Sequence, residues 1–149
     1  MDSDDISVKE RIQTQVDFML ANPSVDLSGS SVIMFSEQNH NLRKVVVHPT
    51  HNTLIKQDML FYCCLAHPSL IIRQRAFPRI RYDEQQKTAQ FPEDYALWLQ
   101  LIDTDTTFAN IGTVLVHLRK HASNLSAGDK MAIEVSLKLP FISAFIEDD

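Results

Sequence analysis

The sequence lacks an excess of basic residues and any long apolar run. Its 14 lysines and arginines against 19 aspartates and glutamates give a formal net charge of −5. That balance argues against a nucleic acid held through its phosphates. The longest apolar stretch, residues 59–66, is too short to cross a lipid bilayer, and no signal peptide or lipidation motif occurs. We therefore expect no nucleic-acid partner and no transmembrane segment.

Spaced cysteines are also missing. The only two, Cys63 and Cys64, are adjacent in the chain. This spacing is too tight for an ordinary disulfide and wrong for a zinc knuckle, so we expect buried free thiols. A reducing, cytoplasmic location follows, with attachment to a membrane surface left open.

The length and composition of the chain are those of an ordinary folded domain. The chain has 149 residues, of which 44% are hydrophobic and 22% charged, and these values are near the globular average. It contains no internal repeat, low-complexity tract or linker. Because this length suits one domain with a buried core, we expect residues 1–149 to form a single domain.

Apolar spacing predicts helices that alternate with strands. Ser7 and Glu10 make a capping-box pattern, which predicts a helix over residues 8–21. Further helices are expected at 52–62, 92–103 and 126–138, and strands at 25–35, 44–48, 69–73 and 108–118. The inward positions expected are Val8, Ile12, Val16 and Met19 in the first helix and Tyr95, Trp98, Leu99 and Ile102 in the third. The alternation predicts a mixed α/β domain.

Carboxylates alternate at the start of the chain, at Asp2, Asp4 and Asp5. On an extended segment they can turn to one side and offer hard oxygen ligands to Mn²⁺ or Mg²⁺. The alternative is an acidic, frayed terminus that interacts favourably with the dipole of the next helix. Such a cluster usually follows a strand and none precedes it here, so we expect that chain is missing ahead of residue 1.

Two later groups of residues can also take part in catalysis or metal binding. Glu93 and Asp94 open an expected helix, where one carboxylate can serve as a general base, or both can simply stabilise the helix dipole. His121 follows Arg119 and Lys120 just past an expected strand, and its neutral imidazole can complete a metal shell. A lone histidine more often has no such role.

Four arginines form the only local basic cluster. They are Arg73, Arg75, Arg79 and Arg81. The cluster is sparse and is interrupted by apolar residues, so it is either a phosphate or acceptor surface or a set of solvated side chains.

Taken in order, these groups resemble the family 2 glycosyltransferases of the GT-A fold. The segment from the DxD motif onward is represented by Asp2-Ser3-Asp4-Asp5, Glu10-Arg11, Gln15, Asn22-Pro23 and Gly29-Ser30. The later motifs are represented by His67-Pro68-Ser69 with Arg73, Tyr82-Asp83, Glu93-Asp94-Tyr95 with Leu97-Trp98-Leu99, and Arg119 with His121 and Ser126. The resemblance covers residues 1–126, and residues 127–149, an expected helical tail, match nothing in the family. Pro92 and Arg81 depart from the family pattern.

The resemblance implies a partial GT-A fold, with a mixed sheet flanked by helices but without the nucleotide-binding βαβ half. It implies an inverting, metal-dependent transferase of the hexosyltransferase type that moves a sugar from a nucleotide-sugar donor, a UDP-sugar above all, to a glycan or other hydroxyl acceptor. The roles it implies are Asp94 as base, Asp4 and His121 as ligands of Mn²⁺ or Mg²⁺, Asp2 and Arg119 in nucleotide-sugar binding, and Glu93 and Asp5 in support.

Two alternatives stay open. Without the donor half, the chain is either a fragment or a noncatalytic remnant whose exposed sheet edge pairs with a partner or with itself. A metal-binding regulatory domain without transfer chemistry is the third interpretation.

Overall fold

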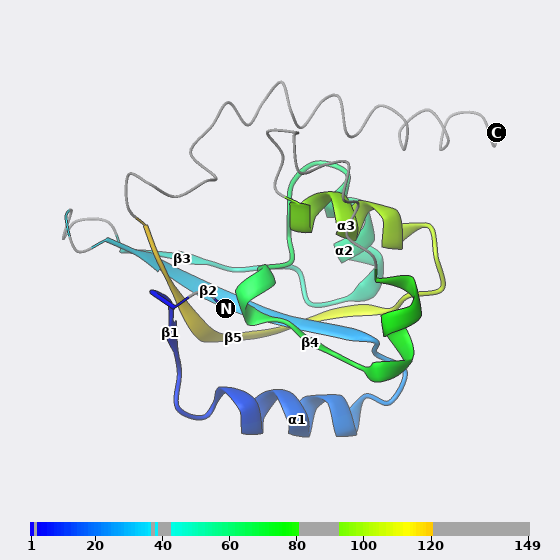
Figure 1. Cartoon of the computed structure of the whole chain (residues 1–149), viewed down its shortest axis with the longest axis horizontal. Helices are drawn as coiled ribbons and strands as arrows, with labels where there is room; N and C mark the ends of the chain where they lie inside the picture. Colours follow the sequence, from blue (N-terminus) through cyan, green and yellow to red (C-terminus); the bar gives the residue numbers. More distant parts are fainter. Residues whose placement is uncertain (2, 37, 39–42, 81–92, 121–149) are drawn as a thin grey trace.

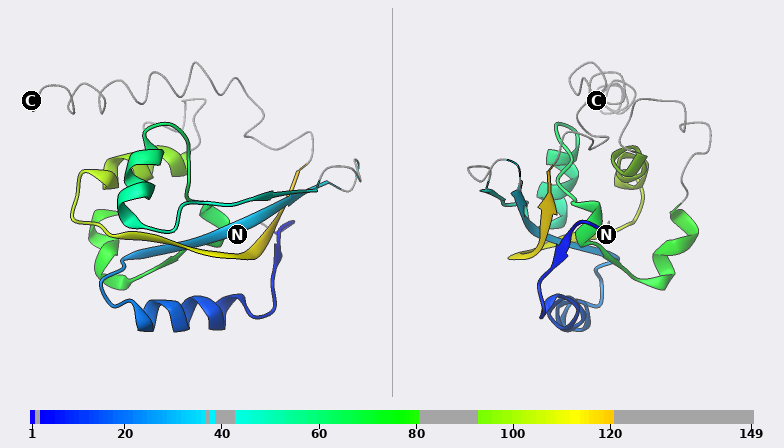
Figure 2. Two further views of the ribbon diagram at one scale, coloured as in Figure 1. Left: turned by 180° about the vertical axis from the view of Figure 1, so that it is seen from behind. Right: turned by 60° about the vertical axis from the view of Figure 1, so that its left-hand side comes forward.

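The computed structural model describes residues 1, 3–36, 38, 43–80 and 93–120, which form a mixed sheet with helices on both faces (Figures 1 and 2). The strands are β1 (Ile6–Ser7), β2 (Leu27–Phe35), β3 (Arg43–Val46), β4 (Ile71–Ile72) and β5 (Phe108–Arg119). The helices are α1 (Arg11–Ala21), α2 (Asn52–Met59) and α3 (Glu93–Ile102), with 3-10 turns η1 (His67–Ser69) and η2 (Gln74–Arg79). The expected mixed α/β class is confirmed.

The sheet is built around one long parallel pair. Strands run in the order β1-β5-β2-β3, and β4 pairs with the beginning of β2. β2 and β5 are parallel over their whole length, from Leu27 opposite Phe108 to Phe35 opposite Arg119, whereas the other pairs are antiparallel. α1 covers one face of this sheet, and α2 and α3 cover the other (Figures 1 and 2).

The predicted strands and helices within the described residues are confirmed in position, but several of them are shorter than predicted. The sequence-based strands at 25–35, 44–48 and 108–118 correspond to β2, β3 and β5, and the helices at 52–62 and 92–103 correspond to α2 and α3. The strand expected at 69–73 is only the two residues of β4, because η1 takes up its first residue. The helix expected at 126–138 lies outside the described residues.

The prediction for the first helix is wrong in its start and in most of its inward face, although Met19 is buried as expected. Ser7 belongs to β1, and α1 begins only at Arg11, without a side-chain cap. Ile12 is 62% exposed, whereas Gln15 is fully buried. Burial of this amide is tolerated because Gln15 accepts a hydrogen bond from Arg11 Nε at 3.0 Å and donates to the Ser69 carbonyl at 2.7 Å. Hydrogen bonding, and not apolar spacing, selects the face of α1 that meets the sheet.

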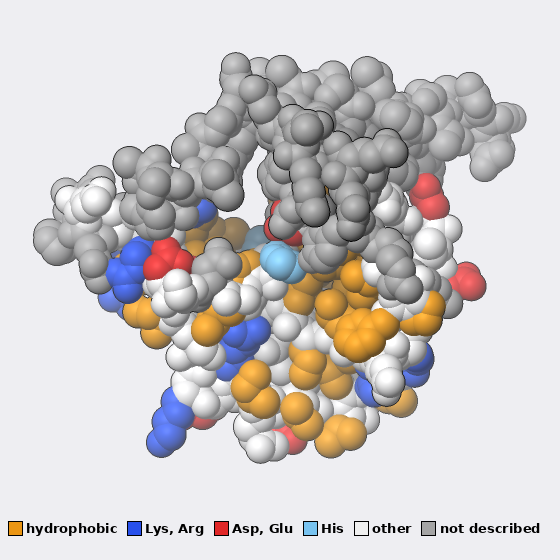
Figure 3. All heavy atoms as spheres, viewed as in Figure 1, with side chains coloured by type: hydrophobic (Ala, Val, Ile, Leu, Met, Phe, Trp, Pro, Cys, Tyr) orange, Lys and Arg blue, Asp and Glu red, His pale blue; other side chains and the backbone are white. Residues whose placement is uncertain are grey.

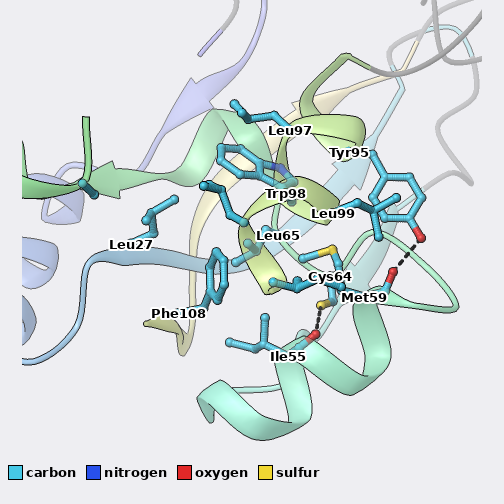
Figure 4. Close-up of a cluster of buried hydrophobic side chains, with 13 residues drawn as sticks. Leu27, Ile55, Met59, Cys64, Leu65, Tyr95, Leu97, Trp98, Leu99 and Phe108 are labelled. Atoms are coloured by element: carbon cyan, nitrogen blue, oxygen red, sulfur yellow. Dashed lines mark hydrogen bonds between the residues drawn. The ribbon is translucent and has the colours of Figure 1, made fainter. Parts of the chain in front are cut away.

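The main core lies between the sheet and the α2 and α3 layer (Figure 4). Trp98 and Phe108 are its largest buried side chains. The Tyr95 hydroxyl donates to the Met59 carbonyl at 2.7 Å, which ties α3 to α2. All four inward positions predicted for α3 are buried.

The cysteines behave largely as expected, since both are free. Cys64 is buried in the core, where its Sγ contacts the Ile55 carbonyl at 3.4 Å, while Cys63 is half-buried. Burial raises the pKa of the Cys64 thiol to about 12, because the apolar surroundings disfavour the thiolate. Cys64 is therefore an inert core residue.

Two of the four clustered arginines hold the fold together. Arg73 donates from Nε to the Val25 carbonyl at 2.7 Å and from its guanidinium to the Met19 carbonyl at the end of α1. Arg75 pairs with the buried Asp26 at 2.7 Å. These contacts favour a structural role for Arg73 and Arg75 over the phosphate or acceptor surface considered from the sequence. Arg81 lies outside the described residues.

One face of α1 leaves an apolar stripe exposed. Ile12, Val16 and Leu20 are 62%, 37% and 71% exposed and lie four residues apart, so they share one side of the helix. Figure 3 shows hydrophobic side chains gathered on this side of the molecule over α1 and towards η2, where Phe77 is exposed. Exposed apolar patches of this kind commonly mark surfaces that bind another protein or a second copy of the same chain.

We expect the isolated chain to self-associate through this stripe. Sedimentation velocity at increasing concentration should show a shift from monomer to larger species, because association removes apolar surface from water. Substituting Ile12→Lys and Leu20→Lys together should reduce that shift, whereas Lys9→Glu, at an exposed polar position outside the stripe, should not. A wild-type chain that sediments as one monomeric species at all concentrations contradicts the expectation.

Candidate functional site

The acidic segment at the start of the chain lies along the last residues of β5. β1 pairs antiparallel with β5, with Ile6 opposite His117 and Ser7 opposite Val116. The next contact inward is Val8 N to the Leu115 carbonyl, at 3.0 Å. Since antiparallel partners run in opposite directions, Asp4 and Asp5 continue beside the end of β5, which leads directly to residue 121.

Two hydrogen bonds join the acidic segment to Arg119. The main-chain N–H of Arg119 donates to Asp5 Oδ1 at 3.1 Å, and Arg119 Nε donates to the Asp4 carbonyl at 2.9 Å. The guanidinium also lies over the Phe35 ring, 4.9 Å from its centre, and Phe35 in turn makes an edge contact with His117. The structure therefore brings together Asp4, Asp5 and Arg119, three of the site residues expected from the sequence.

The expected metal ligands are only partly described. Asp4 is half-buried, while Asp2 and His121 lie outside the described residues. Within the part of the chain that the structure describes, no group of three His, Cys, Asp or Glu residues could hold a metal ion. The Asp4 carboxylate is a donor that suits Mn²⁺ or Mg²⁺ in type, and the pairing of Asp4 with His121 as metal ligands stays a prediction.

Asp94 occupies the first turn of α3. Its Oδ1 accepts a hydrogen bond from the Tyr95 main-chain N–H at 2.8 Å, and the side chain is half-buried. Figures 1 and 2 show the N-terminal end of α3 directed towards the end of the molecule where β1 meets β5. The side chain of Glu93 and residues 81–92, which precede α3, are outside the description. The role of Asp94 as a base therefore stays a prediction.

Sequence reasoning missed Phe35. This residue ends β2 directly opposite Arg119 in the parallel β2–β5 pair. No sequence signal could have identified it, because the register between two strands separated by more than seventy residues is set by packing. Only the content of β-branched and small residues in 25–35 marked β2 as a strand.

A surface groove of about 250 Å³ lies at the opposite end of β5. It is lined by Phe18, Asn22, Val25, Thr50, His51, Asn52, Thr107, Phe108, Ala109 and Asn110. None of these is an expected site residue, and β5 extends for 12 residues between Phe108 and Arg119. The grouping of charged and hydrogen-bonded side chains, and not the presence of this groove, locates the candidate site.

Comparison with known proteins gives glycosyltransferases as relatives. The bifunctional glycosyltransferase pgtA of Dictyostelium discoideum is 31% identical over 156 residues, which cover 85% of this chain and 20% of that protein. The amylovoran biosynthesis glycosyltransferase AmsE of Erwinia amylovora is 30% identical over 119 residues, 80% of this chain and 43% of the relative.

A third relative carries a substrate in its name. The UDP-Glc:alpha-D-GlcNAc-diphosphoundecaprenol beta-1,3-glucosyltransferase WfaP of Escherichia coli is 28% identical over 131 residues, 85% of this chain and 47% of the relative. No protein-family model matches the chain. The chain thus spans from a fifth to just under half of the length of these three relatives, and its mixed, helix-flanked sheet is consistent with part of a glycosyltransferase fold.

The described α-helices α1, α2 and α3 have 11, 8 and 10 residues. Each is too short or too polar to span a bilayer, as far as residues 1, 3–36, 38, 43–80 and 93–120 are concerned.

Proposed function

We propose that the chain carries the metal- and acceptor-binding part of an inverting glycosyltransferase that uses a nucleotide sugar. One observation carries the proposal: the contacts between Asp5, Asp4 and Arg119 place an acidic segment beside the strand that leads to His121. The glycosyltransferase relatives support the reaction class. A UDP-sugar donor is favoured because the name of one relative includes UDP-Glc. A glycan or other hydroxyl compound is the acceptor.

The reaction follows from the roles proposed for these carboxylates. Asp94 accepts the proton of the acceptor hydroxyl as its oxygen attacks the anomeric carbon. The new carbon–oxygen bond forms on the face opposite the bond to the diphosphate, which breaks with its electrons and leaves as nucleoside diphosphate. The configuration at that carbon is therefore inverted.

The residues around the diphosphate serve binding and charge balance. Asp4 and His121 would hold Mn²⁺ or Mg²⁺, and such an ion, when bound, stabilises the charge that develops on the leaving diphosphate. Asp2 faces the ribose or sugar of the donor, and Arg119 contributes to nucleotide-sugar binding. Asp5 and Glu93 support these groups.

A noncatalytic interaction module is the second candidate. The exposed stripe of Ile12, Val16 and Leu20 favours it, because a surface of that kind is typical of an interface. Isothermal titration with UDP and Mn²⁺ separates the two candidates. Binding at millimolar concentration or tighter supports the transferase, no heat supports the module, and Mn²⁺ binding that UDP does not affect supports a metal-binding regulatory domain.

Asp4→Asn should abolish Mn²⁺-dependent binding of UDP and leave the fold intact. The substitution removes an anionic ligand but keeps nearly the same size and shape. Isothermal titration measures the binding, and circular dichroism confirms the fold. The matched control is Asp105→Asn, an exposed aspartate just ahead of the other end of β5, which should bind as the wild type does. Unchanged Mn²⁺ dependence in Asp4→Asn would remove Asp4 from the metal site.

A further inference from the structure

Arg11 is a charged side chain that is buried without an anionic partner. It is the first residue of α1 and is only 8% exposed. Its Nε donates to Gln15 Oε1 at 3.0 Å, and its Nη1 donates to Met1 Sδ at 3.2 Å. Both acceptors are neutral, and a thioether sulfur is a weak one. Within the described part of the chain, no carboxylate pairs with this guanidinium.

Burial of this kind is unfavourable for a cation. Charged side chains in the interior of a protein are almost always paired with an opposite charge. Burial lowers the pKa of the Arg11 guanidinium, and no described carboxylate counteracts that effect. Arg75 differs, because its side chain is 53% exposed and pairs with the buried Asp26 at 2.7 Å. The fold thus leaves the more buried of these two arginines without a counter-charge.

The Arg11 guanidinium is held in a fixed position. Gln15, which accepts from Arg11 Nε, is fully buried and donates from its own Nε2 to the Ser69 carbonyl at 2.7 Å. Gln15 therefore links the guanidinium to η1, on the side of the sheet that α1 covers. Because the side chain is already ordered, little conformational entropy is lost when a ligand binds to it.

Part of the guanidinium is also open to a ligand. An arginine has more N–H donors than the two that Gln15 and Met1 engage. In the described residues, none of the fully buried side-chain atoms that lack a hydrogen-bond partner belongs to Arg11. The remaining N–H groups of Arg11 therefore reach the surface, through a small opening.

The start of α1 adds to the positive potential at Arg11. The N-terminal end of a helix carries a partial positive charge. α1 has no side-chain cap there and no acidic residue in its first turn, and the exposed Glu10 at its N-cap position makes no capping hydrogen bond. The helix dipole therefore acts in the same direction as the guanidinium.

We propose that Arg11 binds a phosphate group, either as free phosphate or as part of a nucleoside diphosphate. The planar guanidinium can donate two parallel hydrogen bonds to phosphate oxygens, which supply the missing negative charge. The small opening favours a compact anion over a carboxylate on another protein. The site includes neither the proposed metal ligands nor Asp94, so the inference goes beyond the proposed function and does not depend on it.

The test measures binding to the chain as it stands, without metal. Isothermal titration gives the affinity for inorganic phosphate, pyrophosphate and UDP at one ionic strength, which is held with sodium chloride. Arg11→Met keeps the approximate length of the side chain and removes its charge. The matched control is Lys9→Met, which removes the same charge at an exposed position two residues earlier.

Arg11→Met should lower the affinity by about 10- to 100-fold, the effect of losing hydrogen bonds from a charged donor. Lys9→Met should bind as the wild type does. Tighter binding of UDP than of phosphate, lost in Arg11→Met, identifies a nucleoside diphosphate as the ligand. Equal affinities that are both lost in Arg11→Met identify free phosphate.

Thermal unfolding separates binding from a purely structural role. Without ligand, Arg11→Met should melt at the wild-type temperature or above it, because the substitution removes an unpaired buried charge. Adding pyrophosphate should raise the melting temperature of the wild type and of Lys9→Met, since a ligand that binds the folded chain stabilises it. It should not raise that of Arg11→Met to the same extent.

A second measurement needs no substitution. The NMR signal of the Arg11 Nε–H, which Gln15 holds, should shift when phosphate is added to the wild-type chain. The Arg73 Nε–H donates to the Val25 carbonyl at 2.7 Å and is the internal reference, whose signal should stay in place. This comparison decides the question even if Arg11→Met fails to fold.

Three results overturn the proposal. They are wild-type affinity in Arg11→Met, an Arg11 signal that phosphate leaves unchanged, and a wild-type chain that binds none of the three ligands. A ligand-free Arg11→Met that melts well below the wild type, together with a wild type that does not respond to pyrophosphate, shows instead that Arg11 only stabilises the fold. The proposed function is tested separately, by the Mn²⁺-dependent binding of UDP in Asp4→Asn.

Discussion

Asp94→Asn is expected to lower kcat by about two to four orders of magnitude, the contribution of a positioned general base. An amide keeps the size of the carboxylate, and its oxygen can still accept the hydrogen bond from the Tyr95 N–H. The first turn of α3 should therefore be preserved while the group that takes up the acceptor proton is lost. Donor affinity should change little, because the base acts on the acceptor.

This measurement is made on a form of the protein that shows sugar transfer. Steady-state kinetics with a nucleotide-sugar donor gives kcat and KM, and titration gives donor affinity. The matched control is Asp103→Asn, an exposed aspartate immediately after the other end of α3, which should keep the wild-type kcat. If Asp94→Asn also keeps it, Asp94 is not the base and α3 serves only the fold.

Trp98→Ala is expected to cost about 3–5 kcal/mol of unfolding free energy, the range for removing a large ring from a core. Trp98 is fully buried, and its indole N–H has no hydrogen-bond partner in the structure. The loss therefore comes from packing against neighbours such as Leu27 and Leu65, and no hydrogen bond contributes to it (Figure 4). Activity should fall only to the extent that the protein unfolds.

Urea unfolding followed by circular dichroism measures this loss, since Trp98 is the only tryptophan and its fluorescence disappears with it. Trp98→Phe should cost less, because a ring still fills part of the space. Tyr95→Phe, which removes only the hydroxyl that donates to the Met59 carbonyl, should cost about 1 kcal/mol. If Trp98→Ala costs no more than Tyr95→Phe, the region of α3 repacks without the indole.

Local patterns predicted the helices well where burial is apolar and poorly where it is polar. In α3 the four predicted inward residues are all buried, because an apolar core selects them. In α1 the pattern failed at Ile12 and held at Met19, since Gln15 is buried instead and reaches the Ser69 carbonyl across 54 positions of sequence. Apolar periodicity contains no information about a hydrogen-bond partner that distant, so Ile12 was wrongly placed inside.

The same distinction applies to the arginines. From the sequence, Arg73 and Arg75 could belong to a binding surface or to solvent. The structure gives them the carbonyl groups at the end of α1 and the buried Asp26. Such contacts depend on how the chain between residues 26 and 73 folds back, which no local pattern records.

Residue order alone predicted the mixed α/β class and the positions of β2, α2, α3 and β5, because propensity and periodicity are properties of short segments. Motif order also named Asp4, Asp5, Asp94 and Arg119 as candidate residues, and their roles stay predictions. Tertiary structure decided which of these residues meet. The antiparallel pairing of β1 with β5 and the parallel register of β2 with β5 bring Asp5, Arg119 and Phe35 into contact. Strand register between distant segments is a consequence of packing the whole sheet, and it set the contacts among these three residues.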